Sequence, residues 1–416
     1  MKYLLILLAV MGLSYPGNSS SLDSLKEYGL GFQWNPKHKR LVIPFEMYAN
    51  LIVIPLHINH SDTLRFLVDT GLGTTLLTDS TVYQKLGLQS LRKLSLLGLG
   101  TGDPIEADVI IDNQIRIGKA IALHQNLIYV SSEQLNLSEF VGTQIHGVIG
   151  YELFANLVVT IDYAHHQLIL TQANRYRYRK RKGLRFDLEV AENKPYIYTM
   201  GIQSKQGELT NRLLLDSGAG HVLFLEGDGI DSSQFNRADQ FVYLGKGLNG
   251  AIVGQWGRVP SMRLGPWKWS NVPAAFPQSK VRMDFSRAKL QGSLGGEFMR
   301  RFVITFHYLD QYVLFQPIGR KWKRDFDLGM SGLNIRAKGP QFKVFMVEAV
   351  QEFSPAAIAG ILAGDEIWMI NEIRADSLSL GDINRMLRKQ SGQKIELIIR
   401  RGKEYHWIQF ELRPLF

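Results

Sequence analysis

Two acidic residues in this sequence stand in closely matching surroundings. One apolar run ends in Asp69–Gly71 (Asp-Thr-Gly), and another ends in Asp216–Gly218 (Asp-Ser-Gly). Aspartate and glycine are common in turns, so a single triplet of this type carries little weight. The pair is more informative, because it predicts two carboxylates that are each held on a tight turn at the tip of a buried strand.

Two carboxylates held close together can act as an acid–base pair on water. The ionised member takes a proton from the water while the protonated member polarises a carbonyl group. Like charges about 3 Å apart do not both ionise readily, so the pair holds one proton between them. The spacing therefore predicts Asp69 and Asp216 as a catalytic pair. Hydroxyl groups that hydrogen-bond across the two copies, and glycines that admit close backbone approach, would support it: Thr70, Gly71, Ser217 and Gly218.

The sequence around each triplet repeats as well. Gly98 follows the first aspartate by 29 residues, and Gly245 follows the second by 29 residues. Such internal repetition fixes architecture, because each copy is one structural unit. The repeat continues in two matched pairs of segments, 147–154 with 292–299 and the long strand patterns 157–170 with 302–315. The chain is therefore expected to contain two copies of one β-rich lobe.

This pattern resembles the retropepsin-like and pepsin-like aspartic peptidases over roughly residues 45 to 317. The resemblance implies a mainly β fold, with two tandem retropepsin-like β-barrel lobes forming a pseudo-two-fold bilobal protease in one chain. A single chain would then supply both aspartates, so we expect an active monomer. Two flap-like segments, where pepsin has one, make the chain similar to a fused retropepsin dimer. The candidate flap residues are Gly98, Gly100, Gly102, Gly245 and Gly247.

The elements that must position these residues are mostly short strands. Aliphatic and β-branched runs between turn residues predict strands near 52–58, 64–68, 196–202 and 212–215. One helix is predicted at Asp79–Lys85, with Asp79 or Ser80 as its cap. By the resemblance, Val148–Gly150 and Ser293–Gly295 would brace the active-site loops. We place lobe 1 at residues 40–172 and lobe 2 at residues 185–318.

The histidines do not predict a metal centre. His165 and His166 are adjacent, and neighbours on a strand point to opposite faces, so they rarely bind one ion. His221 follows the second triplet, where a polar residue with satisfied hydrogen bonds is the simpler interpretation. We assign no metal and no cofactor.

A third domain is predicted at residues 328–416. The segments Ser354–Gly360, Leu362–Ile367 and Ile370–Asn371 resemble a bacterial PDZ domain, a small α+β fold, and a helix is predicted at Leu380–Lys389. PDZ domains bind an extended peptide between a helix and a strand. The candidate peptide-binding residues are Gly332, Leu333, Ile335, Ile383 and Leu387. The alternative is a purely structural β-rich cap.

The first residues have the form of a secretory signal peptide, which we place at residues 1–20. Lys2 precedes an apolar run, Leu4–Met11, that is too short to span a bilayer. The alternative is that this segment is retained as an anchor. The chain has no cysteine, which excludes disulfides and thiol chemistry. Export without disulfides favours a bacterial periplasm or cell surface.

The net charge of +10 raises nucleic acid or anionic lipid as partners. Much of the excess lies in Arg175–Lys182, within a basic linker at residues 173–184, and in Arg320–Arg324 before the third domain. A basic stripe with interleaved tyrosines can bind phosphates and stack on bases. A solvated connector is the preferred interpretation, because the stripe lies at a repeat boundary. We expect no specific nucleic-acid partner.

Three functional classes remain. The first is an exported aspartic endopeptidase whose PDZ domain binds a peptide segment or protein substrate. The second is a non-catalytic peptide-binding envelope protein with a protease-like body. The third is an envelope interaction protein that uses its basic connectors on lipid or nucleic acid. Two aspartates in matching settings favour the first class.

The residues after the two triplets suggest a pH range for activity. Leu72 and Ala219 have no hydroxyl group that could hydrogen-bond to an ionised carboxylate. Such a bond would stabilise the charged form and lower its pKa. We therefore expect the pair to keep its shared proton to higher pH than in pepsin-like enzymes with a serine or threonine there.

Overall fold

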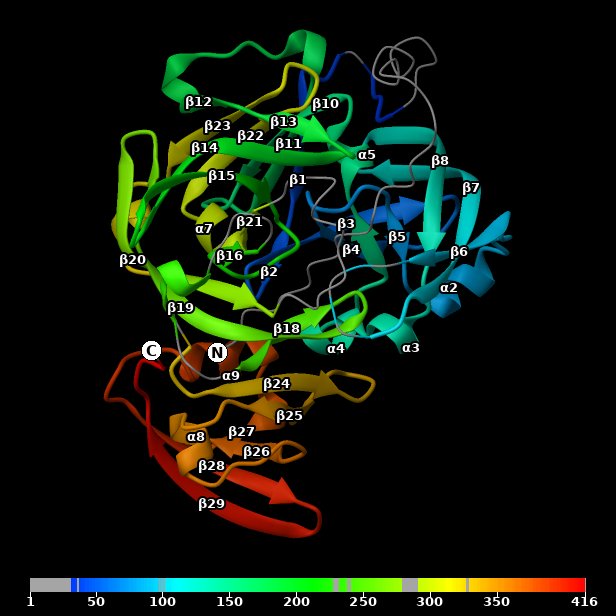
Figure 1. The fold of residues 1–416 in the computed structure, drawn as a ribbon. Helices are drawn as coiled ribbons and strands as arrows, with labels where there is room; N and C mark the ends of the chain where they lie inside the picture. Colours follow the sequence, from blue (N-terminus) through cyan, green and yellow to red (C-terminus); the bar gives the residue numbers. More distant parts are fainter. Residues whose placement is uncertain are drawn as a thin grey trace.

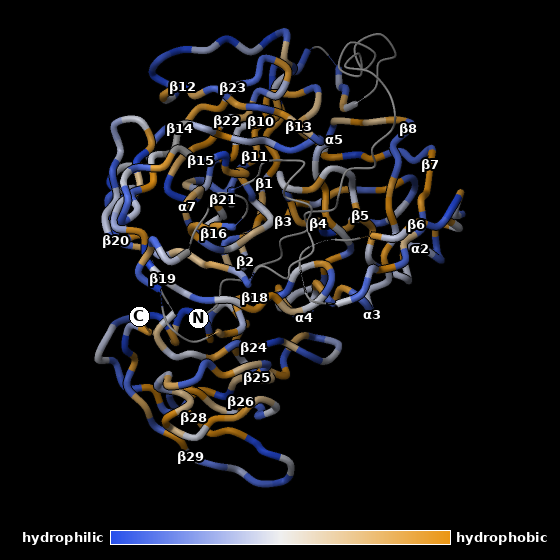
Figure 2. Tube along the Cα trace, in the orientation of Figure 1, coloured by the Kyte–Doolittle hydropathy of each residue, from blue (hydrophilic) through white to orange (hydrophobic). Residues whose placement is uncertain are grey.

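The computed structural model describes residues 31–415 except 36, 97, 99, 101, 227–231, 238–240, 279–290 and 327–328. The expected signal peptide therefore lies outside the described residues. The fold is mainly β, with two large lobes side by side and a smaller third domain packed against one end of them (Figure 1). Apolar residues fill the interior of each part, and polar residues follow the outer loops (Figure 2).

Lobe 1 is built on an eight-stranded sheet in the order β2-β3-β4-β9-β5-β8-β7-β6. Its strands are β2 (Glu46–Tyr48), β3 (Leu51–Ile58), β4 (Leu64–Val68), β5 (Leu76–Leu77), β6 (Arg92–Leu96), β7 (Ile105–Ile117), β8 (Ala120–Tyr129) and β9 (Gly147–Ile149). Its short helices are α2 (Ser80–Lys85), α3 (Ser132–Leu135), α4 (Leu137–Val141) and α5 (Tyr151–Phe154). Helix α2 begins as predicted, because Asp79 accepts a hydrogen bond from Val82 N.

Lobe 2 repeats this plan. Its nine-stranded sheet has the order β13-β14-β15-β21-β16-β20-β19-β17, and β18 pairs with β19. The strands are β13 (Glu189–Ala191), β14 (Lys194–Ser204), β15 (Gly207–Leu215), β16 (Leu223–Leu225), β17 (Asn236–Arg237), β18 (Val242–Gly247), β19 (Gly250–Leu264), β20 (Trp267–Pro277) and β21 (Gly292–Leu294). Helix α7 (Gly296–Met299) follows β21, as α5 follows β9.

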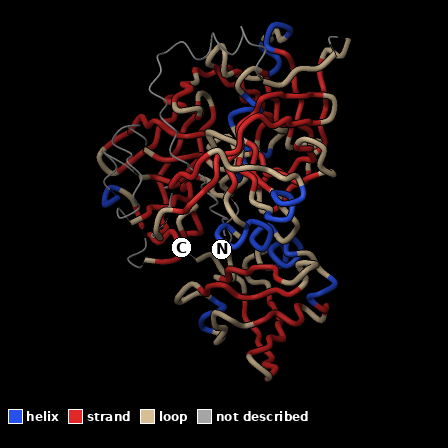
Figure 3. The backbone as a smooth tube through the Cα atoms, turned by 90° about the vertical axis from the view of Figure 1, so that its right-hand side faces the viewer, coloured by secondary structure: helices blue, strands red, loops and turns tan. Residues whose placement is uncertain are grey.

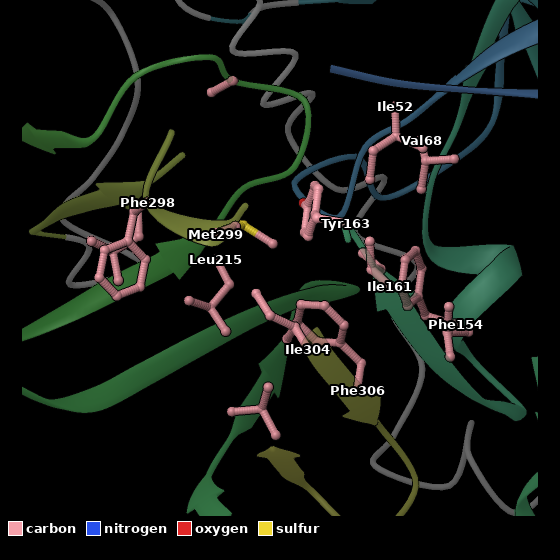
Figure 4. Packing of buried hydrophobic residues seen from close by; sticks show 14 of the residues in the cluster. Ile52, Val68, Phe154, Ile161, Tyr163, Leu215, Phe298, Met299, Ile304 and Phe306 are labelled. Atoms are coloured by element: carbon pink, nitrogen blue, oxygen red, sulfur yellow. The ribbon is translucent and has the colours of Figure 1, made fainter. Parts of the chain in front are cut away.

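A shared sheet joins the two lobes. Its order is β1-β11-β10-β22-β23-β12, and the lobes meet where β10 pairs with β22. Across that seam, Thr160 Oγ1 and Thr305 Oγ1 are hydrogen-bonded at 2.8 Å. Side chains from both lobes pack beside the seam, among them Ile161, Phe154, Ile304 and Phe306 (Figure 4). The strands are β1 (Arg40–Pro44), β10 (Leu157–Asp162), β11 (Gln167–Gln172), β12 (Leu184–Asp187), β22 (Phe302–His307) and β23 (Tyr312–Pro317).

The structure corrects three sequence-based expectations. The runs 157–170 and 302–315 are not single strands but hairpins, with His166 and Gln311 at positive φ in the turns. His165 and His166 therefore lie in a turn and not on a strand, and His165 Nδ1 pairs with Asp162 at 2.8 Å. Lobe 1 also begins before residue 40, because Phe32 and Trp34 are buried in its core.

The basic linker between the lobes lies against the shared sheet. Tyr176 is buried in a small cluster with Val158 and Tyr312, and Lys182 lies over its ring at 4.8 Å. Tyr178 also contacts this cluster. Two of the interleaved tyrosines are therefore packed on the protein instead of being presented for stacking on bases, which supports the interpretation as a connector.

The third domain has a sheet in the order β24-β25-β26-β28-β29, with β27 beside β26. Its elements are β24 (Leu333–Lys338), β25 (Val344–Val350), α8 (Pro355–Ile358), β26 (Glu366–Ile370), β27 (Ile373–Arg374), α9 (Leu380–Met386), β28 (Lys394–Arg401) and β29 (Glu404–Glu411). Ser379 and Asp382 form a capping box at the start of α9. Figure 3 shows helices gathered where this domain meets the two lobes. In the described part of the chain, no helix is long and apolar enough to cross a bilayer.

Candidate active site

The two Asp-Thr/Ser-Gly turns meet at the centre of the bilobal body, each at the end of a buried strand. Strand β4 leads into Asp69 and runs parallel to β9, so that Asp69 N donates to Ile149 O at 2.9 Å. Strand β15 leads into Asp216 in the same way beside β21, and Asp216 N donates to Leu294 O at 2.9 Å. The segments 147–149 and 292–294 thus fix the backbone of both aspartates.

Four hydrogen bonds lock the turns together. Thr70 N donates to Ser217 Oγ at 3.0 Å, and Ser217 N donates to Thr70 Oγ1 at 2.9 Å. Each hydroxyl then donates across the pseudo-two-fold axis to a strand carbonyl, Thr70 Oγ1 to Leu215 O at 2.5 Å and Ser217 Oγ to Val68 O at 2.8 Å. All these groups are buried, so each bond works in a medium of low dielectric constant.

The two glycines are required by close packing. A Cβ atom added at Gly218 would lie 2.2 Å from Asp69 Cγ, and one added at Gly71 would lie 3.3 Å from Asp216 Cγ. Each glycine also donates its own N–H to the aspartate of its triplet, Gly71 to Asp69 Oδ1 at 2.7 Å and Gly218 to Asp216 Oδ1 at 2.9 Å. The backbone thereby approaches both carboxyl groups without a side chain in the way.

The carboxyl groups of Asp69 and Asp216 lie side by side, because a Cβ atom built at Gly71 would be 3.1 Å from Asp69 Oδ1 and 3.3 Å from Asp216 Cγ. Both are fully buried, at 0% and 1% exposure. Burial raises the pKa of both groups, and the negative charge of Asp69 raises the pKa of Asp216 further. The apolar neighbours Leu72 and Ala219 are themselves fully buried. Burial and the repulsion between like charges therefore both oppose ionisation of the two carboxyl groups together.

A hairpin turn of each lobe also contacts the other lobe. Asn50, between β2 and β3, donates its Nδ2 to Gly220 O at 3.2 Å, and Asn193, between β13 and β14, donates its Nδ2 to Gly73 O at 3.2 Å. Both asparagines have positive φ, which the amide side chain tolerates well. Sequence reasoning missed these residues, because their partners lie in the opposite lobe.

Both flap candidates form hairpin tips, one between β6 and β7 and one between β18 and β19. The tips interlock through Asn249, whose backbone O accepts from Gly102 N at 2.5 Å and whose Oδ1 accepts from Gly98 N. Asn249 Nδ2 donates to Asp103 O at 2.6 Å. A Cβ at Gly100 would lie 2.4 Å from the backbone of Asn249. Gly245 and Gly247 lie on β18 and pair with β19. Asn249 itself was not predicted from the sequence.

The predicted PDZ groove residues lie between β24 and α9. Their side chains belong to the core of the third domain: Leu333, Ile335, Ile383 and Leu387 are all at most 3% exposed. Gly332 has positive φ, and a Cβ there would lie 2.1 Å from Ser354. Among the described strands, none pairs with the outer edge of β24, and helix α4 of lobe 1 lies beside it.

No metal centre is formed by the described residues, where no three or more His, Asp or Glu side chains gather. His221 is fully buried with its Nε2 2.9 Å from Ser293 Oγ, and burial lowers its pKa to about 3. It is therefore a neutral residue of the lobe 2 interior.

Comparison with known protein families agrees with this geometry. A family model described as "Aspartyl protease" matches residues 54–153 and 203–298, one segment in each lobe, and one described as "PDZ domain" matches residues 346–401. The chain has duplicated aspartyl protease lobes followed by a PDZ domain. Strand β24 lies before the matched part of the PDZ domain and pairs with its next strand, β25.

Two solved structures are similar to parts of this chain. Basic 7S globulin from soybean is similar over 67% of this chain and 95% of its own, at 11% identity and a TM-score of 0.37. The photosystem II D1 C-terminal processing protease is similar over 22% of this chain, at 22% identity and a TM-score of 0.20. The match covers 24% of that protease, about a quarter of its length. No curated protein matches the sequence closely enough to count as a relative.

Proposed function

We propose that this chain is an aspartic-type endopeptidase in which Asp69 and Asp216 share one proton and activate a water molecule. The observation that carries this proposal is the reciprocal Thr70–Ser217 bonding, which holds the two triplet turns together with their buried carboxyl groups side by side. A purely structural repeat has no need of two neighbouring buried carboxyl groups, because each is costly to desolvate.

The chemistry follows from the shared proton. The ionised carboxylate accepts a proton from water as the water oxygen attacks a peptide carbonyl carbon, and the protonated carboxyl donates to the carbonyl oxygen. Collapse of the resulting tetrahedral species, with a proton delivered to the amide nitrogen, breaks the C–N bond. Because the carboxyl groups are buried and the flap tips are joined through Asn249, a substrate enters only when the flaps separate.

The PDZ domain is proposed to control this opening. Arg336 on β24 lies 4.3 Å from the centre of the Phe140 ring on α4 and 3.6 Å from Glu139. Lys246, on flap strand β18, lies 5.2 Å from the centre of the same ring. Leu248 at the flap tip packs in one cluster with Phe140 and Val141. A peptide that adds to the outer edge of β24 competes with α4 for that edge and thereby loosens the support of the flap.

We also propose that the protein is exported to the periplasm or cell surface, on the strength of the apolar run Leu4–Met11. The active unit is proposed to be a monomer, since one chain supplies both aspartates and both flaps. Peptide segments or protein substrates are the partners that this arrangement fits.

Hydrolysis of a denatured protein by the purified chain, with cleavage sites mapped by mass spectrometry, tests the proposal. Wild-type protein should cleave internal peptide bonds, and Asp216→Asn should not. If the wild type binds peptides without cleaving them at any pH, the alternative of a non-catalytic peptide-binding protein is correct instead.

A further inference from the structure

A lysine lies at the proposed dyad, and sequence reasoning did not single it out. Lys194 is the first residue of β14 and only 3% exposed. The two-residue turn Glu192–Asn193 precedes it, and Asn193 is hydrogen-bonded to Gly73 O of the opposite lobe. The backbone at Lys194 is therefore held against the active-site loop of lobe 1.

The sheet register brings Lys194 close to the dyad. Strand β14 pairs with β15 in the register Tyr196 with Leu214. Two steps further along this antiparallel ladder, Lys194 lies opposite Asp216, and residues opposite each other project from the same face of a sheet. The ammonium group interacts through its charge with Asp216, Asp69 and Glu192. No ion pair within 4 Å joins its ammonium group to a described carboxylate, so Lys194 acts on the two aspartates through space.

Lobe 1 carries an apolar residue at the equivalent position. Its hairpin pairs Tyr48 with Leu51, as the lobe 2 hairpin pairs Ala191 with Lys194. Strand β3 pairs with β4 in the register Val53 with Leu67, so Leu51 lies opposite Asp69 by the same two-step extension. The two hairpins therefore have the same strand pairing, but lobe 2 carries a positively charged side chain where lobe 1 carries an apolar one.

We propose that Lys194 is a positioning residue of the dyad, which holds one carboxylate ionised in the buried site and makes the two lobes electrostatically unequal. This inference rests on the proposed peptidase function. Without a nearby cation, desolvation favours protonation of both carboxyl groups, and a doubly protonated pair cannot accept a proton from water. The ammonium offsets that loss, because it leaves the buried site with one positive and one negative charge.

Few other groups influence the ionisation of the two aspartates and of Lys194. Lys194 acts to lower the pKa of both aspartates against the larger effect of burial. Burial, with smaller effects of Tyr151 and Asp69, raises the pKa of Tyr308, just after β22, well above its usual range, so Tyr308 stays neutral. Glu192 faces Lys194 from the turn and raises the pKa of the ammonium, which burial lowers.

The test compares Lys194→Met with Lys194→Arg, which keeps the charge, and with Leu51→Met, the matched change in lobe 1. The first measurement is the pH dependence of kcat/KM on a short peptide. We expect Lys194→Met to move the acid limb to higher pH by about one unit, because an uncompensated carboxylate is harder to ionise. Lys194→Arg and Leu51→Met should leave that limb where it is.

The second measurement does not need activity. Carbon-13 NMR of the aspartate carboxyl groups in the full chain, with Asp216→Asn used for assignment, follows the dyad directly, and its first ionisation should move upward in Lys194→Met. If the Met variant does not fold, Lys194→Gln takes its place. Unchanged carboxyl titration in the neutral variant overturns the inference. A shifted titration in a chain that hydrolyses no peptide overturns the proposed function and leaves the role of Lys194 intact.

Discussion

The guanidinium of Arg336, in the PDZ domain, lies 4.3 Å from the centre of the Phe140 ring in lobe 1, and Lys246 of the second flap lies near the same ring. The ring of Phe140 thus makes one cation–π contact with the PDZ domain and another with the flap. Gly142, just after α4, adds a tight contact, because a Cβ there would lie 2.6 Å from Leu380 Cβ.

The first prediction is that Arg336→Ala loosens the contact between the PDZ domain and α4. A partly buried cation–π contact contributes about 0.5–2 kcal/mol, so amide hydrogen exchange in α4 and β18 should rise by about twofold to thirtyfold. An extended peptide should bind the PDZ groove more tightly by a similar factor, measured by calorimetry. Arg385→Ala on the exposed side of α9 is the control. Unchanged exchange in Arg336→Ala would show that this contact does not hold the domain.

The second prediction concerns Asp216→Asn, which should abolish hydrolysis and change the pH dependence of stability. The pKa of Asp216 is raised in the folded state, so its stabilising contribution is present below the ordinary aspartate pKa and is lost as pH rises through the raised value. Asparagine has no such dependence. The variant should therefore be more stable than wild type near neutral pH, with the difference shrinking toward acid pH. Urea denaturation across that range measures it, and a difference that grows toward acid pH contradicts the argument.

The third prediction is that Thr70→Val destabilises the protein and lowers kcat. Valine has a similar shape but leaves Ser217 N without its acceptor and Leu215 O without its donor, both buried. Each buried group without a partner costs about 1–3 kcal/mol, so the two groups together suggest a loss of roughly 2–6 kcal/mol. Thr160→Val in the shared sheet, which removes one bond to Thr305, should cost less. Denaturant unfolding of the two variants measures how much free energy of unfolding each one loses.

The fourth prediction is that Gly218→Ala lowers activity far more than the small size of the added methyl group suggests. The new methyl group would lie 2.2 Å from Asp69 Cγ, so either the carboxyl group or the turn must move. Hydrolysis should fall by at least about a hundredfold, since small displacements of catalytic groups have effects of that size. Gly381→Ala in α9 is the matched control. Its methyl group would meet nothing closer than Ser379 Oγ at 3.5 Å, so activity should be unchanged.

The fifth prediction is that Asn249→Ala weakens the interlock of the flaps. The change removes the acceptor for Gly98 N and the donor to Asp103 O. At about 1 kcal/mol for each bond, exchange at the amide of Gly98 should increase by about tenfold or more. KM should change with kcat, because flap closure orders the substrate. Equal exchange in both proteins would mean that the backbone contacts of Asn249 alone join the tips.

Much of this architecture is local in the sequence, which is why it could be predicted. The two triplets and their spacing indicated two lobes, and both bounds of β4 follow from its apolar run before Asp69. Asp79 caps α2 because an N-cap depends on residues three positions apart. The PDZ fold was likewise readable from its closely spaced turn and helix segments.

Other features depend on residues that meet only when the lobes fold together. The two histidines at 165 and 166 gave no sign that a turn, with His166 at positive φ, would replace the expected strand. In the sequence, nothing distinguishes Lys194 from an ordinary charged residue of a strand. The sheet register alone brings it opposite Asp216. Asn249 and Arg336 act on lobe 1 from positions far along the chain. The sequence by itself determined the repeated elements and the pair of aspartates at matching places in them. The tertiary structure decided which charge, flap and domain act on that pair, because those contacts depend on how separate sheets pack in space.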